Sequence, residues 1–356
     1  MTKKKILFTG GHHNSTLVVA LLARKQGYQP VWVGHKFATR GSKSLSAEYQ
    51  EVTKENIPFL ELKTGRFYRQ TNPLEYIKII LGFFQAFIYL LQQKPDLVFS
   101  SGGYLSVPIV IAAWILGIPA ITHEQTVTIG WANKAVIPFV KQILLTHPSS
   151  SRNFPKNKTT VVGLPLRTQL TDKSLKKKFS PKLLYITCGK QGSHIINQAV
   201  FPLIPELVKT YTVVHQTGAN TMTKDADKAR RLKASLGDHQ DRYHYAPYFF
   251  SKEAASYLQS AHLVVSRAGA HQTYELRLLN QRVVFIPIPW VSHNEQFLNA
   301  KLANKDTASL ILEEKDLSSD TLAQAIDQVS TKKKPKSCSL PLNAAEKILK
   351  HINALI

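Results

Sequence analysis

The stretch Lys5-Ile-Leu-Phe-Thr-Gly-Gly-His-His13 is a short apolar run that stops at two glycines, and a helical segment, residues 16–26, follows it. This is the pattern of a buried parallel strand and its crossover helix. It recurs along the first half of the chain, with further strands expected at residues 30–34, 96–100, 118–122 and 142–146 and further helices at 73–93, 107–116 and 129–140. The alternation predicts a parallel α/β sheet.

The pattern starts again after the basic, polar segment 173–181. Strands are expected here at residues 183–187, 211–215, 262–266 and 282–286, helices begin at Ser193, Lys224, Ser251, Ala270 and Asn294, and a last helix covers 343–355. We therefore expect an α/β fold of two doubly wound, Rossmann-like domains, residues 1–168 and 182–340, with a linker at 169–181 and a C-terminal helix at 341–356.

Composition narrows the possible partners. With 356 residues, 44% of them hydrophobic, the chain is too apolar to be disordered. Cys188 and Cys338 cannot form a disulfide framework, and the apolar run 6–8 is too short for a secretion signal, so a reducing compartment is expected. The net charge of +23 predicts an anionic partner, which is nucleic acid, anionic lipid or a phosphorylated small molecule; charge alone does not choose between them.

Two apolar stretches, Ile77 to Leu91 and Val107 to Ile121, fall short of the roughly 18 to 20 uncharged residues that a membrane span needs. The second is expected to be a buried helix followed by a strand. The first is apolar on nearly all faces and is flanked by cations, Arg66, Arg69, Lys78 and Lys94. Both a helix on an anionic membrane and a helix buried beside the sheet fit it, and the net charge favours the membrane.

Four turns place glycine between a strand and a helix: residues 9–13, 101–104, 188–193 and 266–270. Such a turn directs backbone N–H groups and a helix dipole toward one spot, which suits phosphate. One turn alone is usually only a tight loop, whereas four of them predict phosphate binding. None has the spacing of a dinucleotide site or a P-loop.

Asp225-Ala-Asp227 has the form of a metal-binding carboxylate pair. It lies among Lys224, Lys228 and Arg230 on an expected helix, so we interpret it as a solvated charged face. The histidines show no metal-ligand spacing. We predict neither a metal nor a cofactor.

Several blocks occur together in one order: Thr9-Gly-Gly-His12, Gly102-Gly-Tyr104, His123-Glu-Gln125, Val161-Val-Gly-Leu-Pro-Leu-Arg167, Gly189-Lys-Gln-Gly192, Ser266-Arg-Ala-Gly-Ala270 with Glu275, and Glu295-Gln296. In this order the chain resembles the MurG family of peptidoglycan glycosyltransferases, from about Lys5 to about Ala303. The resemblance implies a GT-B fold, in which the two domains face each other across a cleft. It implies transfer of N-acetylglucosamine from UDP-N-acetylglucosamine to the C4 hydroxyl of the muramyl sugar of lipid I, with inversion and without an essential metal. The implied partners are this donor, the lipid-linked acceptor and an anionic membrane surface, without nucleic acid, at the cytoplasmic face of the cell membrane.

The resemblance also implies roles for single residues. His12 and Glu124 are the expected catalytic residues, with His12 as the base on the acceptor hydroxyl; the alternative is a histidine that only caps or orients the loop. His13 is not expected to be the base. Arg167 is expected to pair with pyrophosphate, Glu275 with the ribose diol and Gln296 with the nucleoside. The expected donor-binding residues are Thr9, Gly10, Gly11, Thr126, Arg167, Lys190, Gln191, Gly192, Ser193, Ala270, His271, Gln272, Thr273, Glu275 and Gln296, and the expected acceptor-binding residues are Gly102, Gly103, Tyr104 and His123.

The sequence departs from the family pattern at three places. Leu7 and Phe8 replace a Gly-Gly pair, Thr126 replaces an asparagine, and Lys190 replaces a serine. These departures allow a different lipid acceptor, or a relative that binds nucleotide sugars without catalysis, as alternatives.

Overall fold

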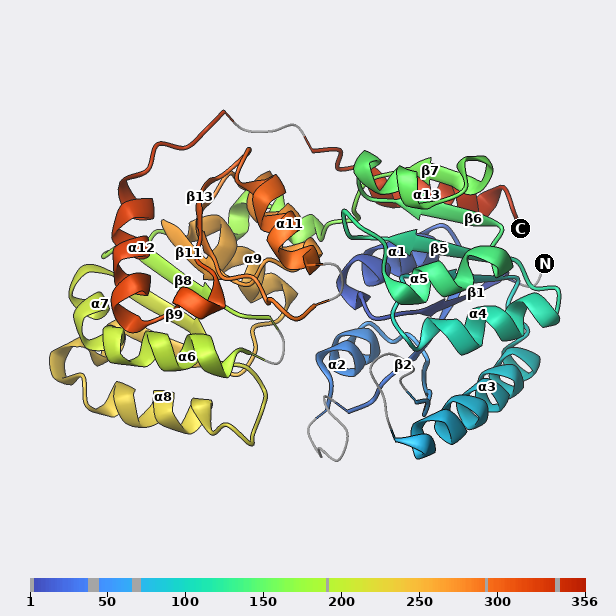
Figure 1. Ribbon diagram of the computed structural model, residues 1–356, viewed down its shortest axis with the longest axis horizontal. Coiled ribbons are helices and arrows are strands. Elements are labelled where there is room, and N and C mark those ends of the chain that lie inside the picture. The colour runs from blue at the N-terminus through green and yellow to red at the C-terminus, as the bar shows by residue number, and fades with distance from the viewer. Residues whose placement is uncertain (1–2, 38–44, 66–71, 190–191, 292–293, 337–339) are drawn as a thin grey trace. The chain divides into compact units, whose positions relative to one another are not determined.

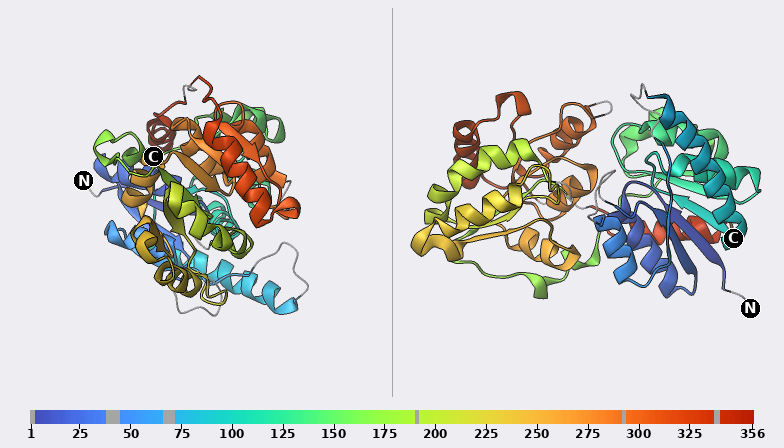
Figure 2. Two further views of the ribbon diagram at one scale, coloured as in Figure 1. Left: turned by 90° about the vertical axis from the view of Figure 1, so that its left-hand side faces the viewer. Right: turned by 90° about the horizontal axis from the view of Figure 1, so that it is seen from below.

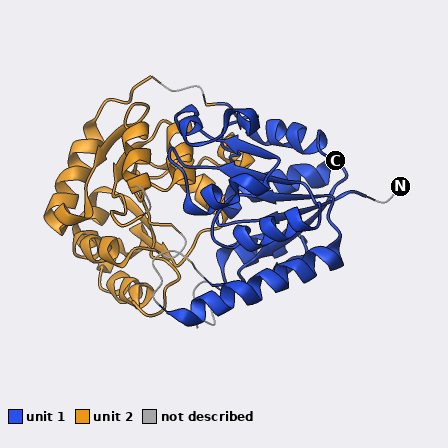
Figure 3. Cartoon of the chain, turned by 45° about the vertical axis from the view of Figure 1, so that its right-hand side comes forward, with its two compact units in different colours: residues 1–166, 341–356 blue, residues 167–340 orange. Residues whose placement is uncertain are grey.

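The computed structural model describes residues 3–37, 45–65, 72–189, 192–291, 294–336 and 340–356. The chain folds into two compact units (Figure 3). Unit 1 comprises residues 1–166 and 341–356, and unit 2 comprises residues 167–340.

Unit 1 is built on a seven-stranded parallel sheet with the order β3-β2-β1-β4-β5-β6-β7. Its strands are β1 (Lys5–Thr9), β2 (Gln29–Gly34), β3 (Phe59–Glu61), β4 (Leu97–Ser100), β5 (Ala120–Glu124), β6 (Gln142–Leu145) and β7 (Thr159–Val161), and its helices are α1 (His13–Lys25), α2 (Ala47–Lys54), α3 (Pro73–Gln93), α4 (Ser106–Ile115), α5 (Trp131–Val136) and α13 (Ala344–Asn353) (Figure 1). Apolar cores lie on both sides of this sheet, as expected of a doubly wound fold.

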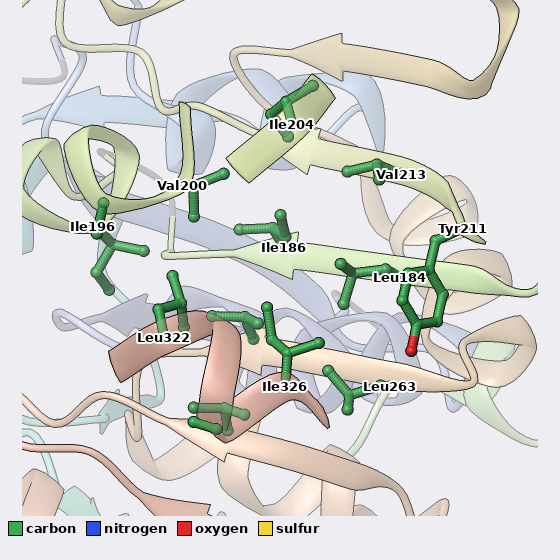
Figure 4. Packing of buried hydrophobic residues seen from close by; sticks show 14 of the residues in the cluster. Leu184, Ile186, Ile196, Val200, Ile204, Tyr211, Val213, Leu263, Leu322 and Ile326 are labelled. Carbon is green, nitrogen blue, oxygen red and sulfur yellow. The ribbon is translucent and has the colours of Figure 1, made fainter. Parts of the chain in front are cut away.

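Unit 2 repeats the architecture with a six-stranded parallel sheet, order β10-β9-β8-β11-β12-β13. Its strands are β8 (Leu183–Thr187), β9 (Thr212–Gln216), β10 (Tyr243–Ala246), β11 (Leu263–Ser266), β12 (Arg282–Phe285) and β13 (Ala308–Ile311), and its helices are α6 (His194–Val200), α7 (Ile204–Thr210), α8 (Asp225–Ala234), α9 (Ser251–Ser260), α10 (Ala270–Leu278), α11 (Glu295–Ala303) and α12 (Ser319–Thr331). Figure 4 shows side chains of its core, where Leu322 and Ile326 of α12 pack against the sheet. The expected pair of doubly wound α/β units is confirmed.

The strand order shows where the direction in which successive strands are added reverses in each sheet, which is called the switch point. In unit 1 the switch lies between β1 and β4, and in unit 2 it lies between β8 and β11. Ligands of such sheets bind beyond the carboxyl ends of the strands at this switch. All four glycine turns predicted from the sequence follow these four strands. The topology therefore brings the turns together in pairs, one pair in each unit.

The expected linker, residues 169–181, and the expected C-terminal helix each pack against one of the two units. Residues 169–181 pack on α9, where Ser256 Oγ donates to Leu175 O at 2.6 Å and Lys177 N donates to Ser260 Oγ at 2.8 Å. They belong to unit 2. Helix α13 lies among the elements of unit 1 (Figure 2), where it packs beside α1 and Tyr28 donates to Asn353 Oδ1 at 2.8 Å.

Candidate functional site

The two glycine turns of unit 1 press against each other. Gly11 N donates to Gly102 O at 2.9 Å, so this amide is used inside the protein. Gly10 and Gly103 both have positive φ, 129° and 80°. A Cβ at Gly10 would lie 2.7 Å from Gly102 O, and one at Gly103 would lie 2.8 Å from Gly11 N. Only glycine fits this close approach.

His12 is the N-cap residue of α1, yet its side chain makes no capping hydrogen bond in the described part of the chain. Its carbonyl instead accepts the hydroxyls of Ser15 and Thr16. The His12 ring therefore does not cap α1 among the described residues, and its alternative role in orienting the loop stays a prediction. The neighbouring His13 is buried and pairs through Nε2 with Glu51 Oε2 at 2.6 Å, which gives it a structural role.

Glu124, at the end of β5, is buried and uses both carboxylate oxygens to hold the following loop. One oxygen accepts from Thr126 N and Oγ1 at 2.9 and 2.8 Å, and the other accepts from Gly130 N and Asn133 Nδ2 at 2.8 and 2.9 Å. These contacts give Glu124 a role in holding the loop and bind the hydroxyl of Thr126 to that loop. The catalytic role of Glu124 and the donor contact of Thr126 stay predictions. Asn133, which sequence reasoning did not select, also accepts from Thr122 at 2.7 Å.

Two of the expected acceptor-binding residues, Tyr104 and His123, also bond to other parts of unit 1. Tyr104 shares a hydrogen bond and a ring contact with His35 and is half-buried. His123 is 1% exposed and donates through Nε2 to Gly163 O at 3.0 Å. Burial lowers the pKa of His123 to about 4, so the ring is neutral at pH 7. His123 therefore ties β5 to the chain after β7, and its expected contact with the acceptor stays a prediction.

Three buried polar atoms without a hydrogen-bond partner in the described part of the chain lie around the start of α1. Thr9 Oγ1, Asn14 Oδ1 and Gln125 Oε1 have no hydrogen-bond partner among the residues that the structure describes. Gln125 is placed beside α1, because its amide donates to Ser15 Oγ. Unpaired buried acceptors cost stability, and the hydroxyl or amide groups of a bound sugar satisfy such atoms.

In unit 2 the first glycine turn also excludes side chains. Gly192 has φ 74°, and a Cβ there would overlap Thr217 O and lie 2.6 Å from Gly218 Cα. Gly189 O accepts from Gln216 Nε2 at 2.7 Å, which fixes the other end of the turn and adds a residue that the motif did not reveal. Lys190 and Gln191, expected at the donor, lie outside the described residues.

Gly192→Ala is expected to lower the free energy of unfolding by about 2 kcal/mol more than Gly189→Ala. Both glycines have positive φ, 74° and 78°, so alanine pays the same conformational cost at either position. Only at Gly192 does the added methyl group meet backbone, since no described atom lies within 4 Å of a Cβ at Gly189. Denaturant unfolding of the two variants measures the difference, and equal losses would show that the overlap is relieved.

Arg267 organises the second turn of unit 2, although only its block and not the residue itself drew notice in the sequence. Its guanidinium donates to Ile286 O at 3.0 Å and to Ser193 Oγ at 2.6 Å and pairs with Glu314. Ser193, expected to face donor phosphates, thus accepts from Arg267, and its side chain makes no capping bond to α6 in the described residues. Arg267 joins the ends of β8, β11 and β12.

Glu275 of α10 is 0% exposed and accepts from Arg167 Nε at 2.6 Å and from His271 Nε2 at 2.9 Å, both at Oε1. Burial opposes its ionisation, but the guanidinium and His271 outweigh burial, so the pKa of Glu275 lies below its usual value. Arg167 is the counter-ion of Glu275, and its expected contact with pyrophosphate stays a prediction. The second oxygen, Oε2, is buried and has no partner among the described residues.

The remaining donor candidates lie on α10 and α11. Ala270 begins α10 directly after Gly269, where no described atom lies within 4 Å of an added Cβ. Thr273 Oγ1 donates to Gly269 O at 2.9 Å, and Gln272 Nε2 is buried without a partner in the described part of the chain. Gln296 accepts from Ile288 N at 3.1 Å and so holds the loop after β12.

The carboxylates of Asp225 and Asp227 do not converge. Asp225 is 3% exposed and accepts from His194 Nδ1 and Asn197 Nδ2, both at 2.9 Å, which corrects its interpretation as a solvated residue. Asp227 pairs with Arg230 at 3.0 Å on the surface. No group of three or more potential metal ligands occurs among the described residues.

Helix α3 presents large apolar side chains to solvent. Residues Leu74, Ile77, Ile80, Leu81, Phe84, Ile88 and Leu91 are each exposed by 50% to 60%. Gly82 lies close to Thr64, and Gln85 donates to Glu61 O at 3.0 Å, so the opposite face packs along unit 1. Within the described residues α3 is also the one helix with the length and composition to cross a membrane, contrary to our expectation that it is too short, and 22% of its most apolar window is buried. Because one face of α3 packs on unit 1, the helix is better suited to lie along a membrane surface than to cross a membrane.

Comparisons with known proteins agree along most of the chain. Residues 9–145 match the glycosyltransferase family 28 N-terminal domain, and residues 183–352 match the family 28 C-terminal domain. A Clostridium perfringens protein named UDP-N-acetylglucosamine–N-acetylmuramyl-(pentapeptide) pyrophosphoryl-undecaprenol N-acetylglucosamine transferase is 33% identical over 92% of this chain and 90% of its own length. A Clostridium novyi protein of the same name is 28% identical over 100% of this chain and 99% of its own.

Solved structures show the same fold at lower identity. MurG from Acinetobacter baumannii superposes with a TM-score of 0.64 and 22% identity, covering 99% of each chain. The UDP-GlcNAc 2-epimerase from Neisseria meningitidis, bound to UDP-GlcNAc, superposes with a TM-score of 0.66 and 14% identity, covering 98% of this chain and 100% of its own. The fold alone therefore does not separate transferase from epimerase, whereas the sequence identities do.

Proposed function

This chain belongs to the MurG family within glycosyltransferase family 28, and from that premise we propose that it transfers N-acetylglucosamine from UDP-N-acetylglucosamine to the C4 hydroxyl of the muramyl sugar of lipid I. The product is lipid II, the precursor of peptidoglycan. The reaction proceeds with inversion and without a metal. The observation that carries the donor assignment is the buried Glu275, whose Oε2 has no partner in the described part of unit 2.

The chemistry assigns a different task to each unit. In unit 1, His12 accepts the proton of the acceptor hydroxyl while that oxygen bonds to C1 of the donor sugar. The bond from C1 to the pyrophosphate breaks, and its electron pair leaves with UDP. In unit 2, backbone amides at the starts of α6 and α10 face the departing pyrophosphate, and Glu275 accepts the ribose hydroxyls. Glu124 holds the unit 1 loop after β5.

Transfer assays with a panel of UDP-sugars and purified lipid I test this function. UDP-N-acetylglucosamine should be consumed with formation of a β1,4 linkage, and chelator should leave the rate unchanged. Transfer to a different lipid at a higher rate would replace lipid I as the acceptor. UDP-sugar binding without turnover on any acceptor would support the non-catalytic alternative.

We also propose that the chain works at the cytoplasmic face of the cell membrane as a peripheral protein, held by the exposed face of α3. The acceptor is a lipid, and a large exposed apolar surface marks a membrane or protein contact. Lys78 on this helix and Lys94 directly after it add attraction to anionic headgroups. Phe83 packs against the core of unit 1, so Phe84 and its exposed neighbours are the residues to vary.

The triple variant Leu81→Ser, Phe84→Ser and Ile88→Ser is expected to weaken binding to anionic vesicles by at least about tenfold, because three side chains lose their burial in lipid. Co-sedimentation with vesicles measures this. Met222→Ser with Trp290→Ser is the control, since both residues are exposed apolar residues of unit 2, by 90% and 67%. A folded triple variant that binds like the wild type contradicts the membrane proposal.

A further inference from the structure

A group of cations lies at the amino-terminal edge of the unit 2 sheet, opposite the edge that carries the donor turns. Lys182 and His262 directly precede β8 and β11, and Arg282 begins β12. These strands are neighbours and parallel, with His262 N bonded to Leu183 O at 2.8 Å and Val264 beside Val283. The register therefore places the three basic residues at the same edge.

Two flanking segments add Lys176 and Lys334. The bonds of Leu175 O and Lys177 N to α9 hold the first segment on either side of Lys176. The second segment is held because Arg282 Nε donates to Lys332 O at 3.1 Å and Asn280 Nδ2 donates to Pro335 O at 2.8 Å. The backbone positions of both lysines are thus fixed by hydrogen bonds.

The charges in this cluster repel one another. Burial lowers the pKa of Lys334, and Arg282 and Lys176 lower it further. Burial likewise lowers the pKa of His262, with further lowering by Lys182, Arg282 and Lys334, against a hydrogen bond to Ser330 that raises it. Among the described residues, no carboxylate forms an ion pair with any of the five side chains. The fold therefore keeps together like charges that destabilise it unless an anion compensates them.

We propose that Lys176, Lys182, His262, Arg282 and Lys334 form a second anion site, which takes a phosphate-bearing group and is separate from the donor site. Three of these residues, His262, Arg282 and Lys334, are half-buried, and the two others are exposed at the rim. A planar guanidinium among ammonium groups suits the several oxygens of a phosphate or pyrophosphate, since each oxygen accepts more than one charge-assisted bond. The phosphate-bearing group that occupies the site is either free pyrophosphate or the headgroup of a lipid.

Titration of the full-length protein with inorganic pyrophosphate tests the site, with the ring resonances of His262 as the local signal. His262→Gln identifies these resonances by their disappearance. Pyrophosphate should shift them and raise the pH at which His262 titrates, because a bound anion stabilises the protonated ring. The signal is local, so it does not depend on whether the donor loop binds pyrophosphate or whether the protein transfers sugar. Absence of a shift overturns the proposal.

Arg282→Gln with Lys334→Gln should weaken this binding by about tenfold or more, since two charge-assisted contacts are lost. Arg231→Gln with Lys305→Gln removes the same charge from exposed positions and should leave it unchanged. An equal affinity in the Arg282 and Lys334 variant and in the wild type overturns the proposal, as does an equal loss in the control.

Lys176→Gln with Lys182→Gln provides the test if the first variant does not fold, because neither exposed side chain makes a hydrogen bond or ion pair among the described residues. This variant should weaken pyrophosphate binding by about threefold, because charges at the exposed rim of a site contribute little. A variant that binds pyrophosphate as tightly as the wild type overturns the proposal. Vesicles containing phosphatidate then separate the sources. Weaker vesicle binding by this variant assigns the site to headgroups, and unchanged vesicle binding with weaker pyrophosphate binding assigns it to free phosphate.

Discussion

His12→Ala is expected to lower kcat for sugar transfer by about 10²- to 10⁴-fold, the usual contribution of a general base. The residue lies in the first of the two closely packed glycine turns of unit 1, and its side chain does not cap α1 in the described part of the chain. Loss of the imidazole leaves the backbone of the turn in place, because the hydroxyls of Ser15 and Thr16 bond the carbonyl of residue 12 and not its ring. Steady-state kinetics with lipid I and calorimetry with UDP measure the two effects separately, and UDP affinity should not change.

His13→Gln is the matched control for this prediction. It removes the buried partner of Glu51 and should lower the free energy of unfolding, while the kcat of the folded protein stays near that of the wild type. A small change in kcat for His12→Ala would reject the base, and a loss of UDP affinity in the same variant would indicate a disturbed fold.

The sequence predicted the inner strands of both sheets and none of the four edge strands, β3, β7, β10 and β13. Inner strands are buried on both faces and are continuous apolar runs. Edge strands mix polar and apolar residues, as in Thr159-Thr-Val161 and Tyr243-His-Tyr-Ala246, and their pairing with a neighbour is a tertiary fact that no local pattern contains. The helix Pro73–Gln93 was predicted to the residue, since Asn72 caps it and Pro73 begins it.

The site was predictable at the level of its turns and less so at its side chains. Glycine turns depend on local conformation, which is written in adjacent residues. The pair of Arg167 and Glu275 joins residues 108 positions apart, and Arg267 reaches Ser193 across 74 positions. Spacing along the chain does not encode such contacts, so the sequence did not predict that Arg167 is the counter-ion of Glu275.

Glu275→Gln is expected to reduce kcat/KM for UDP-N-acetylglucosamine by about 10³-fold, since a carboxylate that accepts two ribose hydroxyls contributes roughly 1.5 to 3 kcal/mol for each. The same change leaves Arg167 without its buried counter-charge, because the guanidinium is 10% exposed and bonds Glu275 Oε1 at 2.6 Å. Stability therefore falls as well. Denaturant unfolding gives that cost separately, and saturating kinetics of the folded protein give the cost to binding.

A substrate analogue distinguishes a direct contact from structural damage. The wild type should discriminate strongly against the 2′-deoxyribose form of the donor, because the buried Oε2 of Glu275 then loses one of its two hydroxyl donors. In Glu275→Gln this discrimination should largely disappear, since the interaction is already lost. Arg167→Gln is the matched control, because it breaks the same ion pair and leaves the carboxylate in place, so its discrimination should persist. Full discrimination by Glu275→Gln would place the ribose elsewhere, and the donor orientation proposed for unit 2 would be wrong.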